Sequence, residues 1–255
     1  MAQDIETDDS TNEDTAGPRR VYSAPALEKG FNVIELLADT PHGLTISEIA
    51  SRLSLSISEI FRVIMVMERR AWLRKGPGDR FRVTPKVLDL AFRATPAEEL
   101  SVVAWPVMHD LAQRIGQSCH LVVRNEDQGL VILRQESPGP TGLSVRIGAS
   151  LSLEKSSSGH VLLAFGPEGK VTAKTEAQLK AVRAQGYEMM DSARTLGVTD
   201  ISYPVFGFDG HLAAALTVPF LKLIDGTQTV DRDEARDHLA RAAARISAGL
   251  GGPEK

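Results

Sequence analysis

The sequence predicts an α+β chain with an N-terminal winged helix-turn-helix, a linker helix and a C-terminal domain of mixed strands and helices. Three observations predict this fold. Two helices with their own capping boxes are separated by a short turn, a two-stranded hairpin follows them, and beyond Ser118 the apolar period changes from helical to alternating. At 255 residues the chain is long enough for two domains that each bury a core.

The composition excludes several classes of protein. The net charge of −4 argues against a protein that coats nucleic acid along its whole surface, although a local basic face is compatible with it. The single cysteine, Cys119, excludes an internal disulfide and fits a reducing compartment. No apolar run approaches the roughly 18 residues of a membrane helix, and the acidic N-terminus is unlike a signal peptide. We expect a cytoplasmic protein with no membrane partner, metal or cofactor.

The expected domain boundaries follow the changes in composition and period. Residues 1–23 are Asp-, Glu-, Ser- and Thr-rich with almost nothing to bury, which is typical of a disordered acidic tail. We expect the winged helix-turn-helix in residues 24–94, the linker helix in 95–116 and the C-terminal domain in 117–250.

The first domain begins with three expected helices. The apolar stripe of the first consists of Leu27, Phe31, Ile34 and Ala38. The stretch "LTISEIASRL" opens with the capping box Thr45-x-x-Glu48, and Ser56-x-x-Glu59 opens a third helix that runs to about Arg70. The segments "AWLRK", "GPGD" and "RFRV" then predict a two-stranded hairpin, which is the wing of a winged helix-turn-helix.

The third helix is the candidate for reading DNA. Its inward face consists of Ile60, Val63, Ile64 and Met67. Ser58, Arg62 and Arg69 lie on the opposite face. In an isolated segment such a face is more often a solvated surface. Here, however, the helix is second in a capped pair and precedes a wing, and eleven Lys and Arg outnumber eight acids between residues 25 and 94.

The predicted DNA contacts are therefore Ser56, Ser58, Glu59, Arg62, Arg69 and Arg80. We expect Arg62 to contact a base edge or a phosphate, Ser58 to hydrogen-bond either, and Arg80 to contact a phosphate from the wing. Glu59 has two interpretations, which are a contact with a cytosine amino group and a purely local role as capping partner.

The expected linker helix is apolar on two sides. One stripe consists of Leu100, Val103, Val107, Leu111 and Ile115, and a second consists of Val102, Trp105 and Met108. Such a helix must pack on two surfaces, which we expect to be its own chain and a twin subunit. Thr95, Pro96 and Glu98 provide a start signal, and Pro106 is expected to kink or split the helix.

The C-terminal domain is expected to be a mixed sheet flanked by helices. The strand candidates are "CHLVVR", "GLVILRQ", "LSVRIG", "DISYPVFG" and "HLAAALTVPF". The helix candidates are "SSSGHVLLAF", "EAQLKAVRAQG" and "RDEARDHLARAAARISAG". In the second half of the chain the serines before Gly159 favour a ligand site, because small residues let backbone amides approach a bound group.

Two other functional classes compete with a ligand-responsive DNA-binding protein. An enzyme is disfavoured, because Cys119 and His120 would alternate faces on a strand, no nucleotide-binding or hydrolase motif is present, and the six histidines lack metal-ligand spacing. His120 alone would line the sheet near a pocket for a ligand. The other alternative is a DNA-binding protein whose C-terminal domain only oligomerises, and the periodicity does not exclude it.

The order of several segments resembles the IclR family of bacterial transcription regulators. The resemblance runs from "APALEKGFNVIELLADTPHGLTISEIASRL" through "GQSCHLVVRNEDQGLVILRQES" to "LGVTDISYPVFGFDGHLAAALTV" and covers about residues 24–248. It implies a GAF-like effector-binding domain, and dimers or tetramers that bind double-stranded promoter DNA and respond to a small metabolite. Ser58 and Arg62 match characteristic residues, whereas Ile57 and Glu59 replace a common lysine and threonine. We therefore expect an unusual operator.

The resemblance also implies an effector site built from three places. These map onto Ser157 and Ser158, onto Met190 (or Asp191 with a one-residue slip) with Asp200, and onto Thr217 and Pro219. Asp200 stands where cysteine is common, and the segment between Phe165 and Ala177 is shorter than usual. Neutral hydroxyls beside an acceptor favour a ligand with its own donors, such as a sugar-like or hydroxylated metabolite. The alternative is that Asp200 faces solvent or caps a helix.

Overall fold

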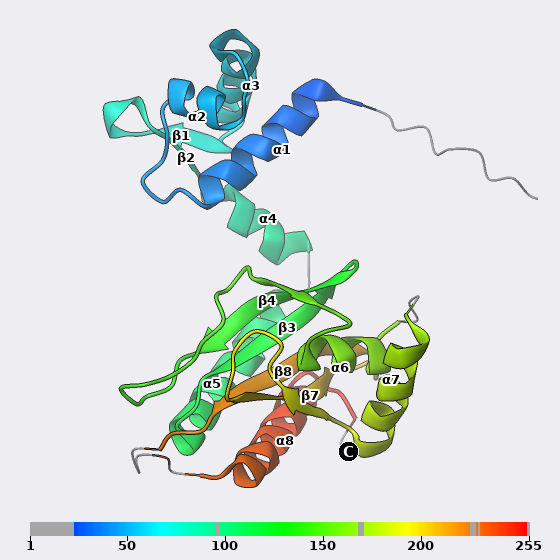
Figure 1. Ribbon diagram of the computed structural model, residues 1–255. Helices are drawn as coiled ribbons and strands as arrows, with labels where there is room; N and C mark the ends of the chain where they lie inside the picture. The colour runs from blue at the N-terminus through cyan, green and yellow to red at the C-terminus, as the bar shows by residue number, and fades with distance from the viewer. Residues whose placement is uncertain (1–22, 95–96, 168–170, 225–227, 229, 254–255) are drawn as a thin grey trace, which may run out of the picture. The chain divides into compact units, whose positions relative to one another are not determined.

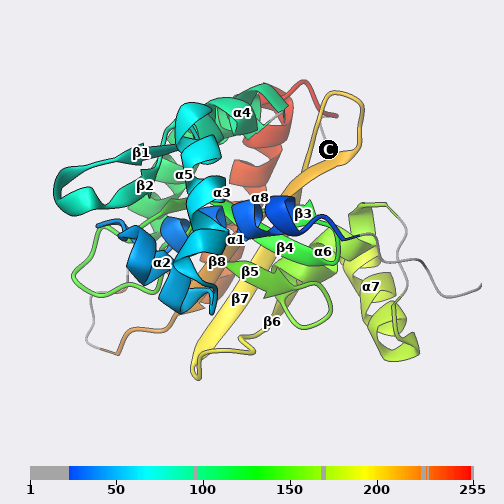
Figure 2. The same ribbon diagram turned by 90° about the horizontal axis from the view of Figure 1, so that it is seen from above.

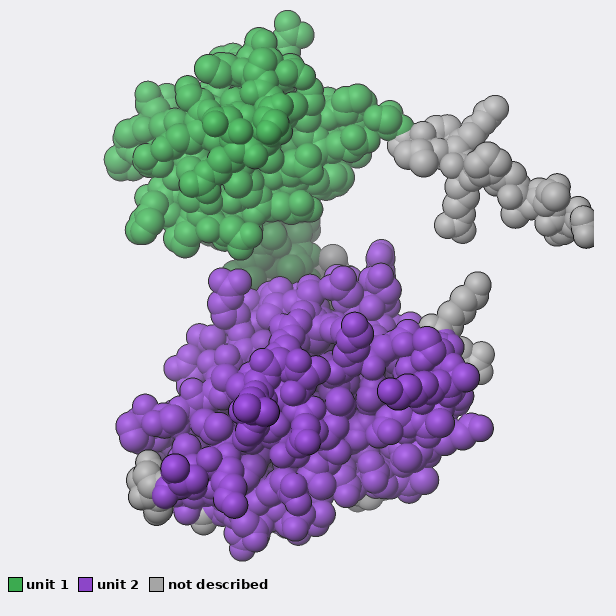
Figure 3. Space-filling view, viewed as in Figure 1, with its two compact units in different colours: residues 1–93 green, residues 94–255 purple. Residues whose placement is uncertain are grey.

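The computed structural model describes residues 23–94, 97–167, 171–224, 228 and 230–253. The chain divides into two compact units, residues 1–93 and 94–255 (Figures 1 and 3). The expected tail, apart from Ser23, lies outside the described residues, as do Thr95 and Pro96. No helix in the described ranges is long and apolar enough to cross a membrane.

Unit 1 is a winged helix-turn-helix. Its elements are α1 (Pro25–Ala38), α2 (Ile46–Arg52), α3 (Ile57–Arg69), β1 (Leu73–Lys75), the 3₁₀ turn η1 (Pro77–Asp79), β2 (Phe81–Val83) and α4 (Lys86–Ala94). Both predicted capping boxes are present, with the Thr45 and Ser56 hydroxyls each accepting from the amide three residues later. β1 and β2 pair antiparallel, and Leu44 hydrogen-bonds Phe81 in both directions, which ties the wing to the start of α2.

The buried face of α1 differs from the prediction. Val33 and Leu37 are buried against α3 and β2, whereas Leu27 and Phe31 are 58% and 55% exposed. α1 is apolar on two adjoining sides, so period alone could not show which side meets the core. Helix α4 was not predicted, and its apolar positions Val87 and Leu88 are exposed within unit 1.

Unit 2 opens with α5 (Ala97–Ile115), which continues through Pro106, so of the two predicted effects of this proline, a kink or a split, the split does not occur. Pro106 and Val102 both face outward, where water can satisfy the Val102 carbonyl that the missing proline N–H leaves free. One apolar stripe packs on the unit's own core. From the second stripe Met108 is buried, but Val102 and Trp105 are 69% and 51% exposed.

A six-stranded sheet forms the centre of unit 2. Its strands are β3 (Cys119–Asn125), β4 (Gln128–Gln135), β5 (Ser150–Ser152), β6 (Glu188–Asp191), β7 (Val198–Phe206) and β8 (Leu212–Leu221), in the order β5-β4-β3-β8-β7-β6. Every neighbouring pair is antiparallel, so the α+β class is confirmed but the sheet is not mixed.

Helices cover both faces of this sheet. α5 and α8 (Arg232–Gly249) pack on one face around a core that includes Leu121, Ile201 and Leu216. α6 (Ser157–Phe165) packs on the other face, and α7 (Ala173–Gln185) lies on the outer side of α6 (Figures 1 and 2). The first turn of α6 therefore starts against the middle of the sheet, where candidate effector residues gather.

Candidate DNA-binding and effector sites

The outer face of α3 is free for contact. Ser58, Arg62 and Arg69 are all exposed, and within the described residues neither arginine has an acidic group within ion-pair distance. Ile60, Ile64 and Met67 on the inner face are buried. The helix is thus anchored by one side and presents hydrogen-bond donors on the other, which is the arrangement required for major-groove readout.

Ser56 and Glu59 are occupied by the capping box. One Glu59 oxygen accepts from the Ser56 amide at 3.0 Å and hydroxyl at 2.7 Å, and the other pairs with Lys29 Nζ at 3.0 Å. The hydrogen bonds from Ser56 and the charge of Lys29 lower the pKa of Glu59 to about 2. The geometry favours the capping interpretation of Glu59 over a contact with cytosine.

Arg80 holds the wing to α2 rather than extending toward solvent. Its two terminal nitrogens donate to the two carboxylate oxygens of Glu48 at 3.0 and 3.1 Å, and Nη1 also donates to the Gly43 carbonyl at 2.9 Å. Bidentate guanidinium–carboxylate pairs are strongly oriented. The predicted phosphate contact of Arg80 therefore competes with a structural role that spacing in the sequence could not reveal.

The predicted effector residues fall on two neighbouring rows across the sheet. In the first row, strand register places Glu188, Ser202, Thr217 and His120 side by side on β6, β7, β8 and β3. Their side chains share a face because directly paired residues point the same way. Val122 and Ala215, two positions along from His120 and Thr217, pack with α6. This row therefore faces the N-terminus of α6.

The second row contains Met190, Asp200 and Pro219, which are paired on β6, β7 and β8. It lies on the same face, two residues along each strand from the first row. Asp191 has the opposite parity and is exposed, so Met190 is the position that shares the face with Asp200. Burial raises the pKa of Asp200, against a hydrogen bond from Ser192.

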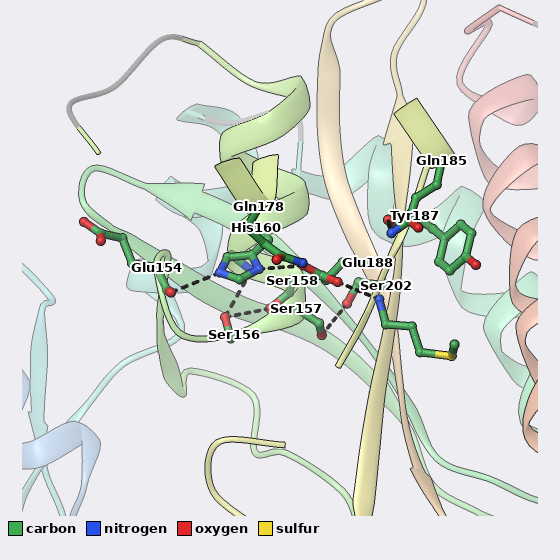
Figure 4. A network of polar contacts seen from close by, with 12 residues as sticks. Glu154, Ser156, Ser157, Ser158, His160, Gln178, Gln185, Tyr187, Glu188 and Ser202 are labelled. Atoms are coloured by element: carbon green, nitrogen blue, oxygen red, sulfur yellow. Dashed lines mark hydrogen bonds and ion pairs between the residues drawn. The ribbon is translucent and has the colours of Figure 1, made fainter. Parts of the chain in front are cut away.

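Three buried hydroxyls connect α6 to the first row. Ser157 Oγ lies 2.8 Å from Ser202 Oγ (Figure 4). Ser202 Oγ in turn lies 2.8 Å from Thr217 Oγ1. Ser158 is also buried, and its hydroxyl lies 3.3 Å from that of the N-cap residue, Ser156. Since each hydroxyl can donate and accept, this chain can reorient its protons to match a bound group.

His120 ends the hydroxyl row with an unused nitrogen. The side chain is buried, and among the described residues its Nδ1 is the buried side-chain atom without a hydrogen-bond partner. Burial lowers the pKa of His120 to about 4, so the ring is neutral at physiological pH. An unpaired polar atom in a buried position is costly, and a ligand or water that bonded it would recover that cost.

A buried ion pair supports the other end of the row. His160 Nδ1 lies 2.6 Å from a Glu188 oxygen, and Nε2 lies 3.0 Å from the Glu154 carbonyl (Figure 4). Both partners are acceptors, so the ring carries both protons. Burial alone would lower the pKa of His160, but these hydrogen bonds outweigh it and raise the pKa. Burial alone would raise the pKa of Glu188, but hydrogen bonds from His160 and Gln178 lower it.

Several residues of this face were not predicted. Ser202 and Glu188 belong to the first row, and Arg134 pairs with His120 from β4. Alternation along "DISYPVF" places Ser202 on the face of Asp200 and could have identified it. The pairing of Glu188 with His160 gives no local signal, because the two residues meet only through tertiary structure.

Gly159 has a packing role. A Cβ at this position would lie 2.4 Å from the Leu153 carbonyl oxygen, so the glycine allows α6 to start close to the preceding backbone. The close approach is to the protein's own backbone, so Gly159 does not indicate a ligand site.

Together these features define a DNA-binding regulator with a separate ligand-sensing domain. Two family models match the chain. The "IclR helix-turn-helix domain" matches residues 26–77, and "Bacterial transcriptional regulator IclR C-terminal" matches residues 93–178.

Known proteins agree with these matches. The transcriptional regulator KdgR of Escherichia coli is 26% identical over 90% of this chain and 94% of its own, and XynR from the same organism is 22% identical over 89% and 98%. An IclR homologue of Microbacterium hydrocarbonoxydans, solved with 4-hydroxybenzoate, superposes with a TM-score of 0.74 at 25% identity, covering 88% of this chain and 98% of its own. The IclR of Thermotoga maritima superposes with a TM-score of 0.67 at 20% identity, covering 88% and 98%.

The chain belongs to the IclR family of transcriptional regulators. It is a ligand-responsive regulator that binds DNA through its helix-turn-helix and an effector through its C-terminal domain, and it is not an enzyme.

Proposed function

We propose that Ser58, Arg62 and Arg69 contact the operator from the outer face of α3, with α3 lying in the major groove of promoter DNA. The observation that carries this proposal is the exposed face of a helix whose other face is anchored in the core, with two arginines that have no acidic partner among the described residues. Arg62 lies one turn beyond Ser58, so the two reach neighbouring bases or a base and its phosphate. Ser56, Glu59 and Arg80 support α3 and the wing.

Fluorescence anisotropy with DNA from upstream of the protein's own gene tests this proposal. We expect Arg62→Ala to weaken binding by about 5- to 150-fold while binding to random DNA changes less, since a base contact is worth about 1–3 kcal/mol. Arg241→Ala, which removes an exposed arginine of α8, is the matched control and should bind as the wild type does. Equal loss in both variants would contradict a specific role for Arg62.

We propose that the effector binds across the two rows at the N-terminus of α6. Ser157, Ser158, Thr217, His120, Met190, Asp200 and Pro219 are the proposed contacts. Asp200 accepts hydrogen bonds, the serine and threonine hydroxyls both donate and accept them, and His120 is neutral. This combination favours a hydroxylated ligand. The complex of the Microbacterium homologue with 4-hydroxybenzoate supports a small hydroxylated molecule.

A thermal-shift screen that includes 4-hydroxybenzoate, benzoate and pentoses tests the ligand class, because a ligand that binds only the folded form raises the melting temperature. Calorimetry with Asp200→Asn then tests the role of the carboxylate. We expect that variant to lose affinity for any hydroxylated hit about tenfold. Unchanged affinity would place Asp200 outside the site.

We propose that the functional boundaries are 24–94, 95–116 and 117–250, and that α5 transmits effector binding to the DNA-binding domain. In this proposal the occupied effector domain changes the spacing of two winged helices on DNA. The proposed location of the protein is the cytoplasm, where DNA and metabolites are both accessible.

We also propose a homodimer. An apolar groove of 540 Å³ lies between α1 and α3. Leu27, Phe31, Val66 and Trp72 are among its lining residues, and Arg62 and Arg70 also line it, so the proposed partner packs on the apolar side chains and leaves both guanidinium groups to DNA. Large exposed apolar patches are uncommon on soluble monomers and usually mark interaction sites. A second copy of the chain is the proposed occupant, since two copies of α3 are needed to read two half-sites.

A further inference from the structure

The first residues of the chain are strongly acidic. Residues 1–18 contain no lysine or arginine, and their acids are Asp4, Glu6, Asp8, Asp9, Glu13 and Asp14. The winged helix-turn-helix that follows has the opposite balance, with eleven Lys and Arg against eight Asp and Glu in residues 23–93. Opposite charge is therefore placed on two adjoining segments of one chain.

The positive charge of unit 1 is largely unpaired and faces outward. Its ion pairs use Lys29, Lys75, Arg80 and Arg93, which leaves the arginines of α2, α3 and the wing. These exposed arginines, for which the described residues offer no acidic partner within 4.0 Å, are Arg52, Arg62, Arg69, Arg70, Arg74 and Arg82. We call this set the basic face.

The described chain begins beside α3. α1 begins at Pro25, and one turn later Lys29 Nζ lies 3.0 Å from Glu59 in the first turn of α3. The start of α1 is thus next to the N-terminal end of α3, which is the end that reads bases in helix-turn-helix proteins. Residues 4–14 are 11 to 21 residues from Pro25, and a chain of about 15 residues spans roughly 20 Å on average.

We propose that the acidic segment, residues 4–14, docks on the basic face of its own chain and competes there with DNA phosphates. Carboxylates and phosphates both accept paired hydrogen bonds from guanidinium groups, so one can replace the other. A short tether gives the attached segment an effective concentration of about millimolar. DNA must therefore displace the segment before it binds to the basic face.

This competition weakens the binding of every DNA by the same factor, so random DNA is released at concentrations where the more tightly bound operator DNA stays bound. Non-specific DNA offers phosphates alone, and the acidic segment supplies similar charge without base edges. Operator DNA adds hydrogen bonds to bases that carboxylates cannot reproduce. The competition involves only the charge of the basic face and does not depend on which residues read the operator.

Paramagnetic relaxation tests docking without DNA. A nitroxide on Ser10→Cys labels the acidic segment selectively, because Cys119 is buried and burial raises the pKa of its thiol to about 12. We expect broadening of amides in α3 and the β1–β2 hairpin at about 50 mM NaCl and its loss at about 500 mM, where charges are screened within a few ångströms. Uniform weak broadening at both salt concentrations would overturn the proposal.

A variant with the six acids changed to Asn or Gln is the matched control for charge, and it should lose the broadening. A mixture of spin-labelled and ¹⁵N-labelled chains identifies the partner. Only contacts between chains can broaden amides in that mixture, so broadening there that accounts for the effect seen when each chain carries both labels would assign the contact to a second copy and overturn docking within one chain.

Binding to a random-sequence 30-bp duplex tests the competition itself. We expect the neutralised variant to bind about three- to tenfold more tightly than wild type at about 50 mM NaCl, and equally at about 300 mM, because the competing contacts are electrostatic. A variant with the same acidic residues in shuffled order should behave as wild type. Equal binding of neutralised and wild-type chains at every salt concentration would overturn the proposal. Because the duplex has a random sequence, this test gives a result even if the proposed operator contacts of α3 are wrong.

Discussion

At the scale of single residues, partners decide what each charged side chain does. Arg62 and Arg80 are both basic residues of the DNA-binding unit. Arg62 is exposed and has no acidic partner among the described residues, whereas Arg80 forms an ion pair with Glu48. The capping boxes could be predicted because their partners are three residues apart. The pairing of Arg80 with Glu48 spans 32 residues and depends on where the wing folds.

Substitutions at these two arginines should therefore have opposite signatures. We expect Arg80→Ala to lower the melting temperature of unit 1, because Glu48 and the Gly43 carbonyl lose their donor, and to weaken DNA binding only through that loss. Arg62→Ala should leave the melting temperature unchanged. Differential scanning calorimetry measures both, and a destabilised Arg62→Ala would show that Arg62 also has a structural role.

The protonation state of His120 is also predicted at this scale. Because burial lowers its pKa to about 4, the ring should remain neutral from pH 7.5 down to pH 5. Two-dimensional ¹H–¹⁵N spectra of the histidine rings report this directly, and His120→Gln identifies the signal by removing it. Titration of His120 above pH 6 would mean that the site is wet or paired with an acid.

At the scale of elements, periodicity predicted the capped helices, the wing and four of the six strands, but not the remainder. The segment "LSVRIG" is no strand, since the backbone turns at Gly148 with a positive φ and pairing resumes at Ser150. β6 has only four residues, too few to show alternation against the background. The face assignment of α1 failed because the neighbouring elements, not the helix itself, decide which apolar side is buried.

The ion pair between α6 and β6 predicts a pH-dependent stability. The raised pKa of His160 contributes stability that is complete below about pH 6.5 and is lost as pH rises through the folded pKa. The lowered pKa of Glu188 contributes stability that is complete above about pH 4.5 and is lost as pH falls through its folded pKa.

We therefore expect His160→Gln to destabilise unit 2 by about 3 kcal/mol between pH 5 and 6.5, and by less at higher and lower pH. Denaturant unfolding across pH 4–9 measures the difference, with Glu188→Gln and the double variant completing a cycle. A difference that is constant across this range would exclude the charged pair as its cause.

The start of α6 should tolerate no added side chain. Gly159→Ala should destabilise unit 2 by about 1–3 kcal/mol, because its Cβ would meet the Leu153 backbone at under 3 Å. Gly139→Ala is the control, since its nearest neighbour is an ordinary 3.5 Å away. Equal unfolding midpoints for the two variants would show that α6 can shift without cost.

At the scale of the whole molecule, the family and both units could be predicted from the sequence, whereas assembly could not. The effector site could be predicted only in part. The family resemblance identified Thr217 and Asp200, but the register of the paired strands was needed to add Ser202. Exposed apolar positions, such as Phe31 and Trp105, recur with the same period as core positions, so the sequence does not distinguish a core contact from a subunit contact. Strand order and helix packing depend on the complete chain.

The proposed dimer can be tested at this scale. Phe31→Glu places a charge in the apolar groove of unit 1 and should shift the protein toward monomer in analytical ultracentrifugation. Phe208→Glu, in an exposed loop of unit 2, is the matched control and should leave the sedimentation coefficient unchanged. A dimer that survives Phe31→Glu unaltered would place the interface elsewhere.

Selection of binding sites from a random DNA pool tests the central claim most directly, because the operator sequence need not be known beforehand. We predict that wild type enriches one motif, with half-sites related by two-fold symmetry and separated by a whole number of helical turns, about 10 bp or a multiple. Arg62→Ala should fail to enrich that motif. Enrichment of the same motif by Arg62→Ala, or of no motif by wild type, would contradict recognition through the outer face of α3.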